Sequence, residues 1–189
     1  MLIKMRFNEV KATQAAARIL RNRGGRMSYM KLIKLLYLAD REALARWGRN
    51  ITTDNYVSMP HGPVLSHVLD LITDQPNPFL AETFWARHIS EPERYEIALK
   101  AEPSGDLLSE AEDELLDEIF KVYGHLTRWQ IVEFAHTLPE WKDPNGSAFP
   151  IELADILTAQ HKKPEEIRAI EEELNAINQV DSFLISSSQ

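Results

Sequence analysis

The sequence predicts a mainly α-helical (α+β) protein: a compact helical domain with a small antiparallel β-hairpin and a C-terminal amphipathic helix. Three observations predict this fold class. Apolar residues recur at three- and four-residue spacings in most segments, which is the period of an amphipathic helix. These segments begin at capping residues and end at glycine or proline. Only one region alternates apolar and polar residues as two neighbouring strands would.

The first two helices are expected in the N-terminal quarter of the chain. Asn8 can cap a helix that Gly24 ends, and Ser28 can cap a longer helix that Gly48 ends. The longer segment, YMKLIKLLYLADREALARW, is apolar on several sides, so we expect it at the centre of the core. Its charged residues are then expected to share the polar surface that remains: Lys31, Lys34, Asp40, Arg41.

The middle of the chain is expected to hold an irregular link, a third helix and the hairpin. The link is RNITTDNYVSMPHG, and Pro63 suits the first position of the helix because that position needs no N–H donor. The segment DQPNP (residues 74–78) stops this helix. FWARHI (84–89) and YEIALKA (95–101) alternate on either side of SEPER and predict the two strands of the hairpin.

The C-terminal half predicts four further helices. Two of them begin at capping boxes, in which Ser109 pairs with Glu112 and Thr127 with Gln130. A short helix is expected at 151–160, and a narrow apolar stripe predicts a long helix from Pro164. We expect residues 1–162 to form the helical domain, and residues 163–189 to form an amphipathic helix and a frayed tail. This last helix either docks on the body or offers a seam to a partner.

Composition bounds the class of protein. The hydrophobic fraction of 44% and the charged fraction of 26% are ordinary for a soluble globular domain. The chain has no cysteine, which excludes disulfides and cysteine-based metal sites and suits a reducing compartment. No apolar run reaches the roughly 18–20 residues that span a bilayer, and the start, MLIKMRFNEV, is not a secretory signal. We therefore expect a cytoplasmic protein without membrane contact.

The net charge of −8 is unevenly distributed. Residues 1–49 have a local balance of +9, whereas the remaining 140 residues have a balance of −17. The basic start can pack beside the acidic remainder and neutralise it, and this is the interpretation that we favour. The alternative is a DNA-binding autoregulator that uses an arginine cluster, although no helix-turn-helix spacing supports it. The cluster consists of Arg18, Arg21, Arg23, Arg26.

His61, His67 and Asp70 form the sharpest hypothesis for an enzyme, a metal-dependent hydrolase. Their spacing crosses a helix boundary and matches no pattern of metal ligands. No nucleophile elbow, Walker loop or dinucleotide-binding glycine motif occurs. We therefore favour structural roles for the histidines, and we expect no enzymatic activity, no cofactor and no metal site.

Two segments read together, KLIKLLYLADREALARWG and ITTDNYVSMPHGPVLSHVLD, resemble the Panacea domain family of SocA-like, phage-associated antitoxins. VEFAHTLPEW resembles the family's later helix, and the resemblance covers roughly residues 8–160. Each motif is weak alone, but their order and spacing make the match fairly specific. The residues that carry the resemblance are Lys34, Leu35, Leu36, Tyr37, Asp40, Tyr56, Gly62, Pro63, Val64, His136, Trp141.

The resemblance implies an antitoxin that neutralises a cognate toxin by direct protein–protein binding, the toxin being encoded by the adjacent gene. SocA-type members instead act as adaptors that deliver the toxin to a protease. We expect the link around Tyr56 to be an exposed polar loop, and we expect changes at Tyr56 or His61 to weaken neutralisation at little cost in stability. Changes at Pro63 or Leu35 should unfold the protein. The candidate partner-binding residues are Tyr56, His61, Gly62, Pro63, His67, Trp141.

Overall fold

The computed structural model describes residues 6–74 and 81–186, and the side chains of these residues up to 180. It is mostly helical with small antiparallel sheets, which confirms the predicted fold class. The predicted stop within residues 75–78 and the predicted frayed tail at 187–189 lie outside the described residues. None of the helices in the described part is long and apolar enough to cross a membrane.

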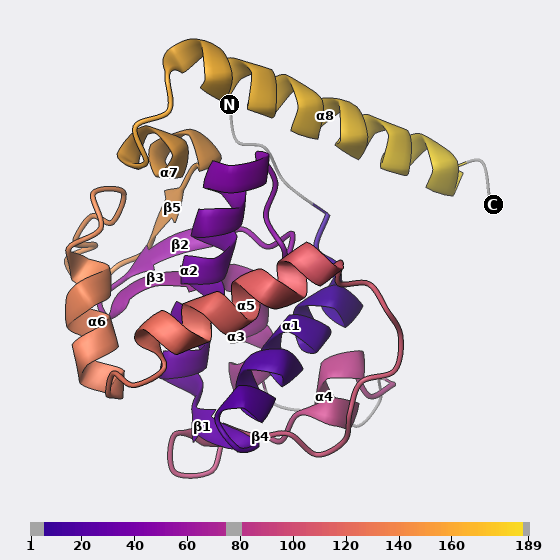
Figure 1. Cartoon of the computed structure of the whole chain (residues 1–189), viewed down its shortest axis with the longest axis vertical. Helices are drawn as coiled ribbons and strands as arrows, with labels where there is room; N and C mark the ends of the chain where they lie inside the picture. Colours follow the sequence, from indigo (N-terminus) through magenta and orange to yellow (C-terminus); the bar gives the residue numbers. More distant parts are fainter. Residues whose placement is uncertain (1–5, 75–80, 187–189) are drawn as a thin grey trace.

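Helix α2 (Tyr29–Trp47) lies at the centre of the molecule, as its sequence predicts (Figure 1). Ser28 occupies its N-cap position, but the Ser28 side chain makes no capping hydrogen bond, so the cap predicted there is wrong. The helix ends before Gly48, whose φ of +69° is a left-handed conformation that favours glycine. The expectation that its charged residues share a polar surface is wrong for three of them. Lys31, Lys34 and Asp40 are buried, because neighbouring elements cover α2 on almost every side.

Helices α1 (Glu9–Asn22) and α5 (Glu110–Tyr123) pack on α2 and on each other (Figure 1). The caps predicted at Asn8, Ser109 and Thr127 form: Asn8 Oδ1 accepts a 3.0 Å hydrogen bond from the amide of Lys11, and both capping boxes are present. The second box begins α6 (Arg128–His136), which also packs on α2. Local sequence therefore sets where these helices begin, and their apolar faces set where they dock.

The predicted hairpin at 84–101 is wrong in its first strand. Residues Phe84–His88 form helix α4, because the Thr83 hydroxyl caps it by accepting from the amide of Ala86 and Trp85 is buried beneath it. The second stretch does form a strand, β4 (Glu96–Ala98), but its partner is β1 (Arg26–Ser28). An isolated bridge between Ile89 and Leu99 is what remains of the expected pairing.

A hairpin does form, at the junction between the expected irregular link and the expected third helix. Strands β2 (Tyr56–Met59) and β3 (Gly62–Leu65) pair antiparallel, and β5 (Phe149–Ile151) completes a sheet of order β3-β2-β5. Pro63 therefore does not begin a helix, and α3 starts later (Ser66–Thr73). Proline is tolerated here because β3 is an edge strand, where one side of the backbone needs no partner.

Two helices close the chain, α7 (Leu153–Ala159) and α8 (Pro164–Ser186). Helix α8 packs on α7 and runs along one end of the molecule (Figure 1). Ile167 and Leu174 on its first half are buried, with exposed fractions of 9% and 2%. Ile177 and Val180 continue the apolar stripe but are 43% and 58% exposed. The first half of α8 is therefore docked, and Ile177 and Val180 beyond it face solvent.

The basic start of the chain does pack against acidic residues from later in the sequence. Ion pairs with N···O distances of 2.6–2.8 Å join α1, β1 and α2 to α5 and to the segment around β4. This arrangement confirms that neutralisation accounts for much of the charge asymmetry. The pairs are Lys11–Glu112, Arg18–Asp117, Arg21–Glu102, Arg26–Glu96 and Arg46–Glu118.

Candidate functional site

Lys34, the lysine of the KLLY motif on α2, contacts the β2–β3 hairpin. Lys34 is 1% exposed, and its Nζ donates a 2.7 Å hydrogen bond to the carbonyl oxygen of Pro63. Burial lowers the pKa of Lys34 to about 7. Gly62 has a φ of +95°, and a Cβ atom there would lie 3.3 Å from Lys34 Cε and 3.2 Å from Ala135 Cβ. The glycine therefore allows both the turn and the close approach of hairpin and helix.

The motif aspartate of α2 organises the segment that leads into β2. Asp40 is fully buried and accepts hydrogen bonds from the amides of Ile51 and Thr52, from the Thr52 hydroxyl and from Tyr56 Oη. Asn50 Nδ2 in turn donates to Tyr56 Oη at 2.6 Å. Desolvation raises the pKa of Asp40 to about 6, and these donors oppose that rise. Tyr56 is thus part of a buried network and not of an exposed loop, which corrects the sequence expectation.

A second buried carboxylate fixes the start of α3. Asp54 is fully buried as a side chain and accepts hydrogen bonds from the backbone amides of His67 and Val68. His67 Nδ1 lies 2.7 Å from Asp54 Oδ1, and its ring stacks on Phe7 with centroids 4.7 Å apart. The carboxylate therefore supplies the N-terminal cap that the predicted proline start did not provide.

Glu140 joins α2 to the segment after α6. It is 5% exposed and accepts hydrogen bonds from Tyr37 Oη at 3.0 Å and from Arg41 Nε at 2.6 Å. Tyr37 also makes an edge-to-face contact with Tyr56, at a centroid distance of 5.4 Å. Burial and the neighbouring carboxylate raise the pKa of Tyr37. The motif tyrosine is therefore a neutral donor within the core.

The motif histidine and tryptophan hold the tip of the hairpin. His136 and Trp141 stack with ring centroids 4.2 Å apart. Trp141 Nε1 donates to the carbonyl oxygen of Met59 at 3.0 Å, and His136 Nε2 lies 3.0 Å from the carbonyl oxygen of Pro60. The side chains that carry the sequence resemblance thus converge on the β2–β3 hairpin from two sides, α2 and the end of α6.

The six candidate partner-binding residues occupy different environments. His61 is exposed at the hairpin tip and contacts the half-exposed Trp129, with ring centroids 5.7 Å apart. The side chain of His67 is 43% exposed, and Trp141 is partly buried. Three of the candidates are buried: Tyr56, Gly62, Pro63. The tip therefore presents His61 to solvent and keeps the other hairpin candidates inside.

The hydrolase hypothesis finds no assembled site. His61 contacts Trp129, whereas His67 contacts Asp54 and Phe7, so the two histidines serve different neighbours. His67 and Asp70 both line a hollow of about 600 Å³ beside α4, but His61 is not among its lining residues. Among the described side chains, those of residues 6–74 and 81–180, no three from His, Asp or Glu gather in a way that could hold a metal ion.

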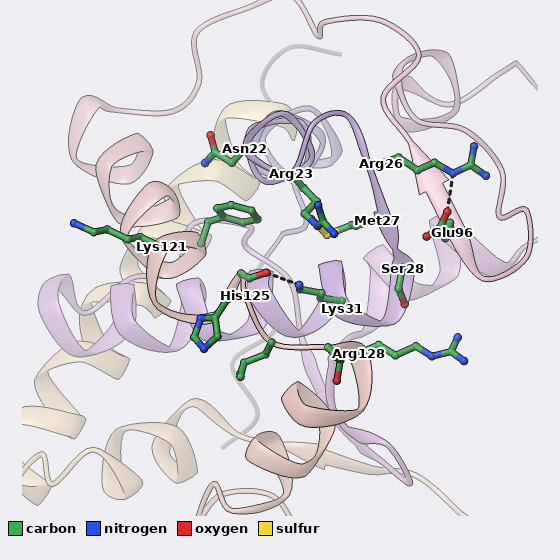
Figure 2. Close-up of a pocket in the computed structure, with 14 residues that line it drawn as sticks. Asn22, Arg23, Arg26, Met27, Ser28, Lys31, Glu96, Lys121, His125 and Arg128 are labelled. Carbon is green, nitrogen blue, oxygen red and sulfur yellow. Dashed lines mark hydrogen bonds and ion pairs between the residues drawn. The ribbon is translucent and has the colours of Figure 1, made fainter.

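A basic hollow of about 750 Å³ lies between the end of α1, β1, the start of α2 and the α5–α6 turn (Figure 2). We use this name for the space lined by Arg23, Arg26, Lys31, Lys121, His125 and Arg128. Sequence reasoning singled out two of its residues, Arg23 and Arg26, as members of a cluster. It missed the others because they come from three further elements, which only the fold brings together.

The comparison with known families gives one result. The family model described as "Antitoxin SocA-like, Panacea domain" matches residues 32–142, more than half of the chain. The match includes most of α2, the β2–β3 hairpin and α6, but neither α7 nor α8. No curated protein and no solved structure matches the chain. The chain therefore belongs to the SocA-like Panacea antitoxin family.

Proposed function

We propose that this protein is an antitoxin that neutralises a cognate toxin by direct, stoichiometric protein–protein binding and that it catalyses no reaction itself. The observation that carries the proposal is the family match over residues 32–142. The partner is the toxin encoded by the adjacent gene, and both proteins act in the cytoplasm.

The use of the motif residues supports a binding role. Lys34, Asp40 and Trp141 direct their polar atoms at backbone or side chains of the protein itself. Polar groups that are already paired and buried are suited to fixing a shape, whereas reacting groups must be reachable by substrate. What they fix is the hairpin, whose tip residues Pro60 and His61 face solvent.

The domain division is part of the proposal. Residues 1–162 carry the family domain, and residues 163–189 add a helix that lies outside the matched region. The exposed stripe of Ile177 and Val180 offers this member a contact that the shared domain lacks. The rival role as a DNA-binding regulator is weakened because three of its four arginines are engaged in ion pairs: Arg18, Arg21, Arg26.

Co-expression tests the proposal. Induction of the adjacent gene alone should arrest growth, and induction together with this protein should restore it. Arrest that persists while both proteins are present and folded would exclude the antitoxin function.

The same assay separates blockade from the alternative of proteolytic delivery. In host strains that lack individual energy-dependent proteases, direct blockade should neutralise the toxin fully, and toxin levels should remain unchanged. Neutralisation that disappears in one such strain would instead identify this protein as an adaptor.

A further inference from the structure

The basic hollow carries more positive charge than its surroundings neutralise. Arg26 pairs with Glu96 at 2.8 Å and lies 3.6 Å from Glu93, and Lys31 Nζ donates to the carbonyl oxygen of Gly124 at 2.5 Å. Among the described residues, no carboxylate lies within 4.0 Å of the remaining cations, which are Arg23, Lys121, Arg128. In a protein with a net charge of −8, this is a local excess of unpaired positive charge.

The arrangement of these cations is visible in the close-up. Arg23 and Lys31 lie near the middle of the hollow, while Lys121 and Arg128 lie toward opposite sides of it (Figure 2). The pKa of Lys31 is lowered by burial and by the nearby charge of Arg23. An anionic partner that enters the hollow would relieve this repulsion, so the site is electrostatically prepared for one.

Exposed aromatic residues border the hollow on one side. The guanidinium of Arg128 lies 5.6 Å from the ring centroid of Tyr95 and 5.1 Å from that of Trp129. These rings are 64% and 49% exposed, and the ring of Trp129 also contacts that of His61 at the hairpin tip. We call Tyr95, Trp129 and His61 the aromatic rim. Tyr, Trp and Arg are the residue types that most often dominate the energy of protein interfaces.

We propose that the basic hollow and the aromatic rim together form the toxin-docking surface, and that an acidic segment of the toxin occupies the hollow while an apolar side chain packs on the rim. This inference rests on the proposed function and adds the location of the contact and the chemistry of the partner. Arginine binds carboxylates in a two-point geometry that gives direction as well as attraction. The rim supplies apolar contact area beside it.

Two features favour an acidic protein segment over nucleic acid as the occupant. The cations line a single hollow and do not extend as a stripe along which a phosphate backbone could run. Two carboxylates limit the positive area: Glu96 lines the hollow and is paired with Arg26, and Asp117 accepts a hydrogen bond from Asn22. Such carboxylates would repel neighbouring phosphates of an extended polyanion, whereas a short acidic segment can contact the unpaired cations alone.

Charge reversal in the hollow tests the proposal. Arg23→Glu combined with Lys121→Glu changes two exposed residues without breaking an ion pair among the described residues. The matched control is Arg49→Glu, an exposed arginine after the opposite end of α2. The double variant should bind the toxin at least tenfold more weakly and the control should bind it normally, with both melting as the wild type does.

The partner's chemistry is tested by compensation and by salt. Asp→Lys and Glu→Lys substitutions scanned across the toxin should include at least one that recovers binding to the double variant. Raising the salt concentration should weaken wild-type binding more steeply than that of the double variant, because screening acts on the charge contacts.

The outcomes separate this inference from the function beneath it. If the wild type binds the toxin and the double variant binds it equally well, the docking site is wrong while the antitoxin function stands. If the wild type neither binds nor neutralises the toxin, the proposed function itself fails. A third outcome would also overturn the inference. If the wild type shifts the DNA upstream of its gene in a gel, and the double variant does not shift it but still binds the toxin normally, the hollow is a nucleic-acid site.

Discussion

The amino group of Lys34 on α2 donates a 2.7 Å hydrogen bond to the carbonyl oxygen of Pro63 on β3, and both residues are buried. This bond joins the central helix to the hairpin whose tip faces solvent. No described carboxylate forms an ion pair with Lys34. A lysine without such a partner is costly to bury, so its position reflects a requirement for a donor at that point. The two clearest motifs of the sequence, KLLY and GPV, are therefore one structural unit.

The burial of Lys34 makes stability depend on pH. Its pKa is about 7 in the folded protein and 10.5 for an unburied lysine, so between these values the unfolded state binds more protons. Stability should therefore rise as the pH rises through this window, and fall toward its lower limit as the pH drops below about 7. Urea unfolding should show that wild type gains about 2 kcal/mol over Lys34→Met between pH 7 and pH 9.

Two other buried groups, Lys31 and Asp40, also have shifted pKa values that could affect the comparison of wild type with Lys34→Met. Lys31 has a lowered pKa of the same sense, but it is present in both proteins and cancels. Asp40, with its pKa raised to about 6, stabilises the folded state at low pH. That contribution is lost as the pH rises through about 6, which is below the range of pH 7 to pH 9 used for the comparison. Equal pH slopes for wild type and Lys34→Met would show that Lys34 is not buried as described.

Gly62→Ala should destabilise the protein by roughly 2 kcal/mol, because the φ of +95° strains a residue with a Cβ and the new atom crowds Lys34 and Ala135. Gly146→Ala is the matched control, since its φ of +84° is similar but no atom lies within 4 Å of the added Cβ. Thermal melts of both variants measure the difference. Identical losses would remove the close approach at Gly62 from the explanation.

Tyr56 and His61 should separate stability from binding. Tyr56→Phe removes the hydroxyl that donates to Asp40 and accepts from Asn50, and should cost about 1–3 kcal/mol in urea unfolding. His61→Ala removes an exposed side chain and should change stability by less than about 0.5 kcal/mol while weakening toxin binding several-fold. The sequence alone predicted that a change at either residue would weaken binding at little cost in stability. A stable Tyr56→Phe variant with weakened binding would support that earlier prediction.

Helix α8 should show a boundary between its docked first half and the exposed residues Ile177 and Val180. Leu174→Ala removes a side chain that is 2% exposed and should cost about 2 kcal/mol or more. Ile177→Ala changes the same stripe one turn later, where the side chain is 43% exposed, and should cost much less. Comparable losses in denaturant unfolding would mean that Leu174 and Ile177 are docked alike.

Local patterns predicted the helices well, because caps such as Asn8 and Ser109 act within a few residues. They failed where the deciding partner is distant. Nothing near Tyr56 in the sequence indicates that its hydroxyl reaches Asp40, sixteen residues earlier. Pro63 has a backbone geometry that suits both a first helical turn and an edge strand, so its neighbours across the sheet decided the outcome.

The candidate surface was harder still to predict. His61 could be identified as a candidate because it lies within the family motif. The basic hollow is built from five separate elements, and the rim depends on the packing of Arg128 between Tyr95 and Trp129. The charge asymmetry showed that the basic residues are concentrated in the first 49 positions. It could not show which of these cations form ion pairs with acidic residues from later in the chain and which remain unpaired.

Calorimetric titration of this protein with the purified product of the adjacent gene tests direct neutralisation most directly. Stoichiometric antitoxin action predicts saturable binding at a fixed molar ratio, weakened by Arg23→Glu with Lys121→Glu and unchanged by Arg49→Glu. Absence of binding between the two folded proteins, in a pair for which co-expression still relieves toxicity, would contradict neutralisation by direct contact.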